Sequence, residues 1–495
     1  MSFAQIVPTA LSARDPLLTT KLAIAFTLAV LADWLFYDQI IGISAVIFAV
    51  ALIAGAAIAN AARLDRRRIW LAGLVLIAGL VPAMEDANAL SLAFVIVALG
   101  LALSRTTHPD LDGPKQFARA SCDLFVTGPL RFFRDATGML SLPGITSSLT
   151  VWFIPLVLGA FFIFLFGTAN PVIANWISQL NPGNAASHVS VARSLFWIAA
   201  LSLVWPFVHV RWRARPETAA RSTGAVAPDL APASQFYQLL GAAAILRSLI
   251  LFNLVFAVQT ALDLIYLWGN VELPAGITYA SYAHRGAYAL MLTALLAAGF
   301  VLAAMRPGGP ASNVKVIRPL VYVFVAQNIL LVASSILRLD LYVQIYLLTC
   351  WRVAAFIWML LVALGLVLIV ARIALERPNS WLIGANMIVL AVVLYFCSLT
   401  NFAAIIADYN VTHSREAAGQ GVTIDMNYLL QLGPQALPAI DKALRLRATD
   451  PFLAARRDGL ADDQARRMAS WRAWGFRSWR LQRYMSVPQN RSTAG

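Results

Sequence analysis

Long apolar runs recur along the chain between Lys21 and Leu399, and short polar stretches separate them. A helix that crosses a bilayer needs about 20 predominantly apolar residues. By that rule we predict about eleven spans, near residues 21–38, 41–61, 69–85, 87–104, 149–168, 191–210, 243–267, 286–305, 319–337, 352–371 and 381–399. The pattern predicts an all-α fold, a polytopic bundle of transmembrane helices.

Basic residues are distributed unevenly among the predicted loops. They gather in alternate loops, whereas the basic residues assigned to the opposite face are Arg193, Arg285 and Arg338. Because Lys and Arg are enriched in cytoplasmic loops, we expect a cytoplasmic N-terminus and, after an odd number of spans, an extracytoplasmic C-terminus. The basic side chains are nearly all Arg, a bias typical of GC-rich bacterial genomes. We therefore expect a multi-pass protein of the bacterial inner (cytoplasmic) membrane.

The chain divides by composition into four predicted parts. Residues 215–234 are rich in Pro, Ala, Ser and Thr, which is typical of a linker. Residues 400–495 hold 13 of the 38 basic residues and only short apolar stretches, which predicts a small helical domain. The predicted parts are an N-terminal six-span region (1–210), a cytoplasmic linker (211–240), a five-span region (241–399) and an extracytoplasmic helical domain (400–495).

Two further segments mix aromatic, apolar and basic residues. Residues 115–140 suit either an amphipathic helix on the inner leaflet or a solvated loop helix. Residues Trp471 to Tyr484 interleave Trp and Arg, which suits an interfacial helix or a helix docked on the body of the protein. The same mixture can stack on single-stranded nucleic acid, but the expected outer location argues against that partner.

Composition excludes several classes of protein. The chain is 60% hydrophobic and 13% charged, whereas a soluble domain carries about 25% charged residues. The net charge of +14 is explained by positive loops facing one side of a bilayer, so we expect lipid and no nucleic acid as partner. The three cysteines form no C-x-x-C pair, and no nucleotide-binding, zinc-protease or nucleophile-elbow motif is present. The sequence thus predicts no cofactor or metal and gives no evidence for an enzyme.

A few charges lie within or beside predicted spans, all toward the outer leaflet. A charge in the hydrocarbon costs about 2.5–3.5 kcal/mol on insertion scales, so such groups usually face the bundle interior and pair. They form one candidate polar cluster: Asp33, Asp263, Arg285, Arg338, Asp340 and Arg352. One interpretation is an outward cavity for a polar or anionic solute. The other, which closeness to helix ends favours, is a set of ion pairs that pin those ends.

Four stretches of the sequence carry recognisable motifs between about residue 240 and the end. The first contains Tyr282, Arg285 and Gly286, and the second runs from Arg338 to Arg352. The third runs from Asn401 to Asn410, and the fourth contains Asp425 and Tyr428. The motif residues are Tyr282, Gly286, Tyr342, Tyr346, Thr349, Asn401, Tyr409 and Asn410.

Together these stretches resemble a bacterial family of polytopic membrane proteins known as domain of unknown function 4153/4173. The resemblance implies a membrane topology and no reaction. The chain departs from the family's pattern at four places. Leu347 stands where the family has Gly, Ala289 where Glu is common, and Phe402 and Ala403 where Pro and Asp are common. An activity that needed that Glu or Asp would be absent from this chain.

Three hypotheses for the function follow. The first is an inner-membrane protein with a transport-like or solute-sensing role through the outward polar cluster. The second is a scaffold or signalling protein that binds an envelope partner through its outer C-terminal domain. The third is a membrane enzyme acting on a lipid-linked substrate, which would need a carboxylate or His beside a groove open to lipid.

Overall fold

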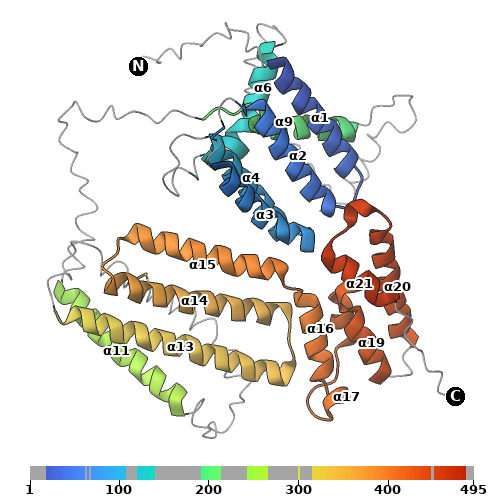
Figure 1. Ribbon diagram of the computed structural model, residues 1–495. Coiled ribbons are helices and arrows are strands. Elements are labelled where there is room, and N and C mark those ends of the chain that lie inside the picture. The colour runs from blue at the N-terminus through green and yellow to red at the C-terminus, as the bar shows by residue number, and fades with distance from the viewer. Residues whose placement is uncertain are drawn as a thin grey trace, which may run out of the picture. The chain divides into compact units, whose positions relative to one another are not determined.

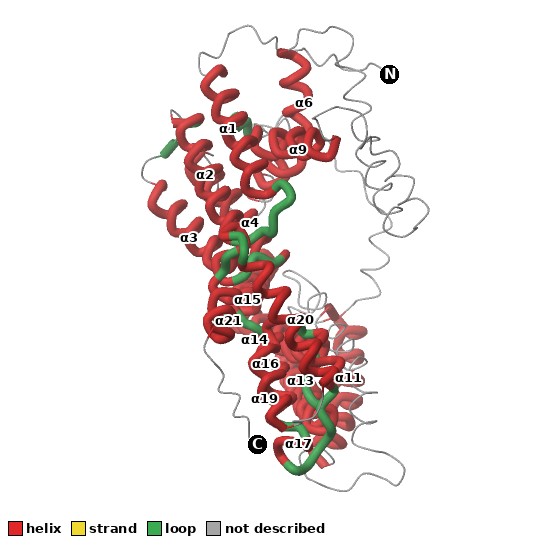
Figure 2. The backbone as a smooth tube through the Cα atoms, turned by 90° about the vertical axis from the view of Figure 1, so that its right-hand side faces the viewer, coloured by secondary structure: helices red, strands yellow, loops and turns green. Residues whose placement is uncertain are grey.

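The computed structural model is built of helices. It describes residues 18–61, 64–65, 68–107, 117, 120–139, 191–212, 242–265, 299–300, 315–446 and 451–486. Within these ranges the regular elements are helical and no strand occurs (Figures 1 and 2). The chain divides into two compact units. Unit 1 holds residues 1–217 and 470–476, and unit 2 holds residues 218–469 and 477–495.

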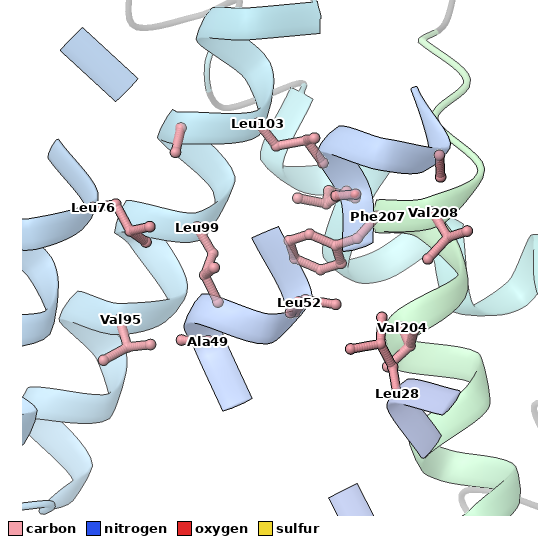
Figure 3. Close-up of a cluster of buried hydrophobic side chains, with 14 of the residues drawn as sticks. Leu28, Ala49, Leu52, Leu76, Val95, Leu99, Leu103, Val204, Phe207 and Val208 are labelled. Atoms are coloured by element: carbon pink, nitrogen blue, oxygen red, sulfur yellow. The ribbon is translucent and has the colours of Figure 1, made fainter. Parts of the chain in front are cut away.

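Unit 1 is a bundle of apolar helices with one amphipathic helix packed on it. Its helices are α1 (Leu18–Phe36), α2 (Ile43–Ala59), α3 (Ile69–Glu85), α4 (Ala89–Thr107), the π-helix Asp123–Thr127, α6 (Gly128–Met139) and α9 (Val191–Val208). Side chains from α1, α2, α4 and α9 meet in a common core (Figure 3). Small residues let the helices approach closely, as at Gly79, where an added Cβ would lie 2.2 Å from the Ala98 side chain.

In the described part of unit 2, four apolar helices come first in the sequence. They are α11 (Ala242–Asp263), α13 (Ile317–Tyr346), α14 (Cys350–Ala374) and α15 (Asn379–Leu399), and each packs against the next (Figure 1). Phe324, Met359 and Leu366 are among the core residues between them. Many large apolar side chains on these helices, such as Ile383 and Ile388, are exposed. A hydrophobic exterior of this kind suits a helix that faces lipid.

The remainder of unit 2 is a group of shorter helices within that unit, here called the tail domain (residues 400–469 and 477–486). Its helices are α16 (Phe402–Thr412), α17 (Arg415–Ala418), α18 (Met426–Gln431), the 3-10 turn Pro434–Ala436, α19 (Leu437–Leu446), α20 (Pro451–Met468) and α21 (Phe476–Ser486). Ala407, Leu429, Ile440 and Leu453 belong to its own hydrophobic core. Arg457 binds Asp441 beside that core, with Nε to Oδ1 at 2.8 Å.

The all-α prediction and the membrane character are confirmed. Six described helices are long and apolar enough to span a bilayer: α1, α4, α11, α13, α14 and α15. Three more predicted spans coincide with the shorter apolar helices α2, α3 and α9. The predicted spans at 149–168 and 286–305, and the linker at 215–234, lie outside the described residues apart from positions 299–300. The total of about eleven spans and the four-part division therefore stay predictions.

The two mixed segments fold differently from one another. In 115–140, α6 packs on α9, where Asp135 accepts a hydrogen bond from Trp205 Nε1 at 3.1 Å. The segment from Trp471 to Tyr484 is not one helix. A 3-10 turn at Trp471–Ala473 belongs to unit 1, and α21 follows in the tail domain.

Candidate functional site

A buried ion pair joins α11 to α13. Asp263 ends α11 and is 1% exposed, and Arg338 on α13 is 3% exposed. Arg338 Nη2 donates to Asp263 Oδ1, and Gln259 Nε2 donates to the same oxygen from one helical turn earlier, at 2.9 Å. The low dielectric of such a site strengthens the attraction, while removal of either partner would leave a buried charge.

Further polar side chains are buried on the same two helices. Asn253 Nδ2 donates to Leu320 O at 3.2 Å, and Asn328 is 1% exposed. We call the set Asn253, Asp263, Asn328, Ser335 and Arg338 the polar stripe. Because Asn253 reaches the start of α13 and Asp263 reaches its later part, the two helices run in the same direction.

The side-chain oxygens of the two asparagines in the polar stripe have no hydrogen-bond partner among the described residues. They are Oδ1 of Asn253 and Oδ1 of Asn328, and both are enclosed. The amide nitrogen of each bonds back to its own helix, at 2.8 Å and 2.7 Å. Buried polar atoms in folded proteins are nearly always paired with protein or with ordered water. The stripe is therefore suited to hold water or a small polar molecule.

Arg352 stabilises the end of α13 rather than joining the polar stripe. Its Nη1 donates to Tyr346 O at 2.6 Å and to Leu347 O, and its guanidinium lies 4.6 Å from the centre of the Tyr342 ring. The last carbonyl groups of a helix lack partners within the helix and carry partial negative charge. Arg352 supplies both the donors and the opposite charge, and the tyrosines supply a cation–π surface.

The turn between α13 and α14 is held by the tail domain. Asn410 Nδ2 donates to Leu348 O at 2.9 Å, and Asn410 Oδ1 accepts from Leu348 N at 2.7 Å. The Tyr428 hydroxyl accepts from Cys350 N at 2.8 Å. Burial, together with the contact to Cys350, raises the pKa of Tyr428 to about 12. Thr349 begins α14 as its N-cap and accepts from Arg352 N at 3.4 Å.

Leu347 explains the glycine of the family pattern. Its φ of 63° and ψ of −176° lie in a region that is essentially restricted to Gly. The turn needs this conformation because α13 ends and α14 begins within a few residues. A Leu is held there by its burial, at 6% exposure. Burial of the side chain offsets a strain of order 1–3 kcal/mol.

Other motif residues shape the tail domain itself. Asn401 caps α16 by accepting from Ala404 N at 3.2 Å, and it donates to Gln435 Oε1 at 2.9 Å. Asp425 caps α18 by accepting from Tyr428 N at 3.0 Å, which places the Tyr428 ring. Tyr409 stacks on His413 with ring centres 4.0 Å apart. Burial raises the pKa of Tyr409, and the nearby Asp340 carboxylate adds to the shift.

The candidate cluster predicted from the sequence is brought together only in part. Asp263 and Arg338 pair in unit 2, whereas Asp33 lies in unit 1, where Arg193 Nε donates to its Oδ1 at 2.9 Å. Asp340 is exposed and accepts from Gln344 Nε2 at 2.9 Å. The predicted site residues Tyr282, Arg285 and Gly286 lie outside the described residues.

Residues 470–476 of the chain lie on unit 1. Trp474 O accepts from Ile43 N at 2.7 Å, and the Arg472 guanidinium lies 4.7 Å from the centre of the Trp34 ring. At Gly42 the approach is close enough to exclude a side chain, since an added Cβ would lie 2.4 Å from the Ala473 backbone. The segment thus packs beside the end of α1 and the start of α2, while its flanks belong to unit 2.

Sequence reasoning missed the two asparagines of the polar stripe. Neither Asn253 nor Asn328 belongs to a motif or to the predicted charged cluster. The available signal was their place inside long apolar runs, where an amide is costly unless it is paired. Asn410 and Tyr428 were recognised as motif residues, but nothing in the spacing indicated that they reach the α13–α14 turn.

The comparisons with known proteins add a family and nothing further. The chain matches the family described as Domain of unknown function (DUF4153) over residues 22–443. No curated protein and no solved structure matches it. The match spans both units and most of the tail domain, and its description assigns no activity.

Proposed function

The chain belongs to the family described as Domain of unknown function (DUF4153), and we propose that it is a solute-responsive protein of the bacterial inner membrane. In this proposal a small polar or anionic solute enters the polar stripe from the outer side, and α13 passes the change to the tail domain. The observation that carries it is the buried Asp263–Arg338 pair in apolar helices. An ionisable residue at membrane depth is by default a candidate for a solute or ion pathway.

The charge pattern of the pair suits an anionic solute. Arg offers a planar fork of donors that matches a carboxylate or phosphate. A solute carboxylate that displaced Asp263 from Arg338 would leave the Asp263 carboxylate buried without its partner, so in this proposal solute entry moves Asp263 toward water or protonates it. The enclosed amide oxygens of Asn253 and Asn328 lie farther along the same helices, where they would accept hydrogen bonds from water rather than from a small solute bound at Arg338.

The tail domain is placed to respond because it holds the end of the helix that carries Arg338. Arg338 lies near the end of α13, and Leu348 lies in the turn that directly follows this helix. Asn410 binds the backbone of Leu348. A shift of α13 along or about its axis would alter the hydrogen bonds of the turn. Interfaces of this kind amplify small shifts because packed contacts have discrete arrangements.

The proposed orientation has an extracytoplasmic tail. It rests on the positive-inside rule and is supported by the position of residues 470–476. These residues pack beside the connection between α1 and α2. The charge pattern assigns that connection to the outer face.

Cysteine accessibility tests the solute pathway. In a background with serine at the three native cysteines, Ser335→Cys reports on the polar stripe and Leu330→Cys on the exposed face of α13. A small, membrane-impermeant thiol reagent added from outside should label position 335 and leave position 330 unlabelled. If position 335 stays unlabelled while extracytoplasmic control positions are labelled, the proposed solute pathway is wrong.

A second candidate function is an envelope scaffold that binds a protein partner through the tail domain. The observation in its favour is that the motif residues Asn410 and Thr349 stabilise the α13–α14 turn and are not part of the polar stripe. Its test is a photo-crosslinker at Phe452, which is 62% exposed on α20. A discrete adduct with one envelope protein in cells, lost in Asn410→Ala but kept in Asn386→Ala, supports this function. No adduct at Phe452 or elsewhere on α20 would contradict it.

A further inference from the structure

One buried arginine of unit 2 has no counter-charge among the residues that the structure describes. Arg372, in the last turn of α14, is 4% exposed. Its Nε is enclosed without a hydrogen-bond partner, and its guanidinium makes no hydrogen bond or ion pair with any residue that the structure describes. An arginine stays protonated in proteins. A buried, unpaired charge is among the most costly arrangements a fold can contain, so this site calls for an anion.

The neighbours of Arg372 are also cationic. Arg318, at the start of α13, donates to Ile373 O at 3.3 Å, which brings the first turn of α13 against the last turn of α14. Lys315 and Arg377 are exposed at the same end of the bundle, two or three positions from helix ends. Glu376 is the acid of this turn, and its carboxylate accepts from Arg318 at 2.8 Å rather than from Arg372.

Two helix N-termini add partial positive charge at this end. The N-caps of α13 and α15, Val316 and Pro378, provide no side-chain hydrogen bond to the first turn. The first N–H groups of such helices lack intrahelical partners and attract anions. The helix ends alone would define no site. Together with a buried unpaired guanidinium they form an anion-binding environment.

We propose that Arg372 is the buried anchor of a phosphate-binding site between the ends of α13, α14 and α15. The ligand is a phosphate group, with Arg372 donating from within the bundle and Arg318, Lys315 and Arg377 at the rim. On the proposed orientation this end faces the cytoplasm. The phosphate then comes either from an anionic lipid headgroup of the inner leaflet or from a soluble phosphate compound. Basic pockets between helices on that side are typical of headgroup binding.

This site is separate from the Asp263–Arg338 pair, which lies near the opposite end of α13. Its occupancy would fix how α13, α14 and α15 meet at their inner ends. A bound phosphate would therefore stabilise the helix pairs of unit 2 by mass action. The proposal holds whether or not the polar stripe binds a solute.

The test uses the purified full-length protein in detergent, with thermal unfolding measured against added phosphatidylglycerol, phosphatidylcholine or inorganic phosphate. The wild type should be stabilised by phosphatidylglycerol or by phosphate and unaffected by phosphatidylcholine. In Arg372→Gln, the anion concentration that gives half of the stabilisation should rise at least about tenfold. That is the factor for one lost charge-assisted hydrogen bond. The matched control is Arg68→Gln, which removes a half-exposed arginine paired with Asp65 in unit 1, and it should respond as the wild type does.

The outcomes of this experiment distinguish the two sources of the phosphate group from each other and from the absence of a site. Stabilisation by phosphatidylglycerol alone assigns a lipid headgroup, and stabilisation by inorganic phosphate alone assigns a soluble ligand. An equal response in Arg372→Gln and wild type, or no response to either anion, overturns the proposal. A folding defect in Arg372→Gln is controlled by Arg372→Lys, which keeps the charge but not the planar fork. That variant should retain part of the response.

Discussion

Asn410 binds the backbone of Leu348 on both its N–H and its C=O, so that one side chain of the tail domain pairs with the α13–α14 turn as a neighbouring β-strand would. The contact joins residues 62 positions apart in the sequence. It also explains why an asparagine is suited to the end of this motif. Only an amide side chain offers a donor and an acceptor side by side in the spacing of a peptide group.

Replacing Asn410 should loosen the tail domain without unfolding it. Asn410→Ala removes two hydrogen bonds and should cost about 1–3 kcal/mol. Hydrogen exchange at the Leu348 and Cys350 amides should accelerate, while the core of the tail domain around Ile440 keeps its protection. Asn386→Ala is the control, because that side chain bonds only within α15 in the described residues. Equal exchange at Leu348 in both variants would contradict the role of Asn410.

At position 347 the usual order of stability, in which an Ala variant is more stable than a Gly variant, should be reversed. Both Leu347→Ala and Leu347→Gly lose the buried side chain, but only Gly relaxes at φ 63°. We expect Leu347→Gly to be more stable than Leu347→Ala by about 1 kcal/mol. Thermal unfolding of the pair measures the difference. The same pair at Leu348, whose φ is not positive, should show the ordinary order with Ala more stable.

Tyr428 should make the contact between the tail domain and the α13–α14 turn sensitive to alkaline pH. Its pKa is raised to about 12 in the folded protein from an ordinary value of 10.0. The neutral form is therefore favoured by folding, and this contribution is complete below pH 10 and is lost as the pH rises from 10 to about 12. Exchange at Cys350 should accelerate over that window. In Tyr428→Phe the same amide should exchange faster at neutral pH and show no added dependence there beyond the chemical rate.

The Asp263–Arg338 pair should show strong coupling in a double-mutant cycle. Asp263→Asn or Arg338→Gln alone leaves a buried charge and should cost about 3–5 kcal/mol. The double variant removes both charges and should be less destabilised than the two single costs together. Denaturant or thermal unfolding in detergent gives the comparison. Strict additivity would mean that the two side chains do not depend on each other in the membrane.

The membrane class could be predicted because it rests on local properties of the sequence. Apolar runs near α13, α14 and α15 are long enough to read without tertiary information. Caps could be read as well: Asp425 precedes the short apolar helix that it caps. By contrast, α2 is regular helix only at Ile43–Ala59, so the predicted span at 41–61 overstates its extent.

The site was less accessible to sequence reasoning because partners are chosen by packing. Asp263 and Arg338 stood out as misplaced charges, but 75 residues separate them and nothing local pairs them. Arg352 looked equivalent to Arg338, yet it caps carbonyl groups of α13. Arg372 looked like one more basic residue of an inner loop. Its importance depends on its burial, which the sequence does not record.

Helix α13 couples the polar stripe to the tail domain in the proposed function, and the accessibility of position 335 to a thiol reagent reports on that coupling. The rate at which an impermeant thiol reagent modifies Ser335→Cys is compared with and without Asn410→Ala, in the cysteine-free background. Loss of the Asn410 contacts should change that rate by about tenfold, since about 1.4 kcal/mol of bias on the opening of the stripe corresponds to that factor. An unchanged rate at Ser335→Cys, with Leu348 exchange accelerated by the same substitution, would contradict the account.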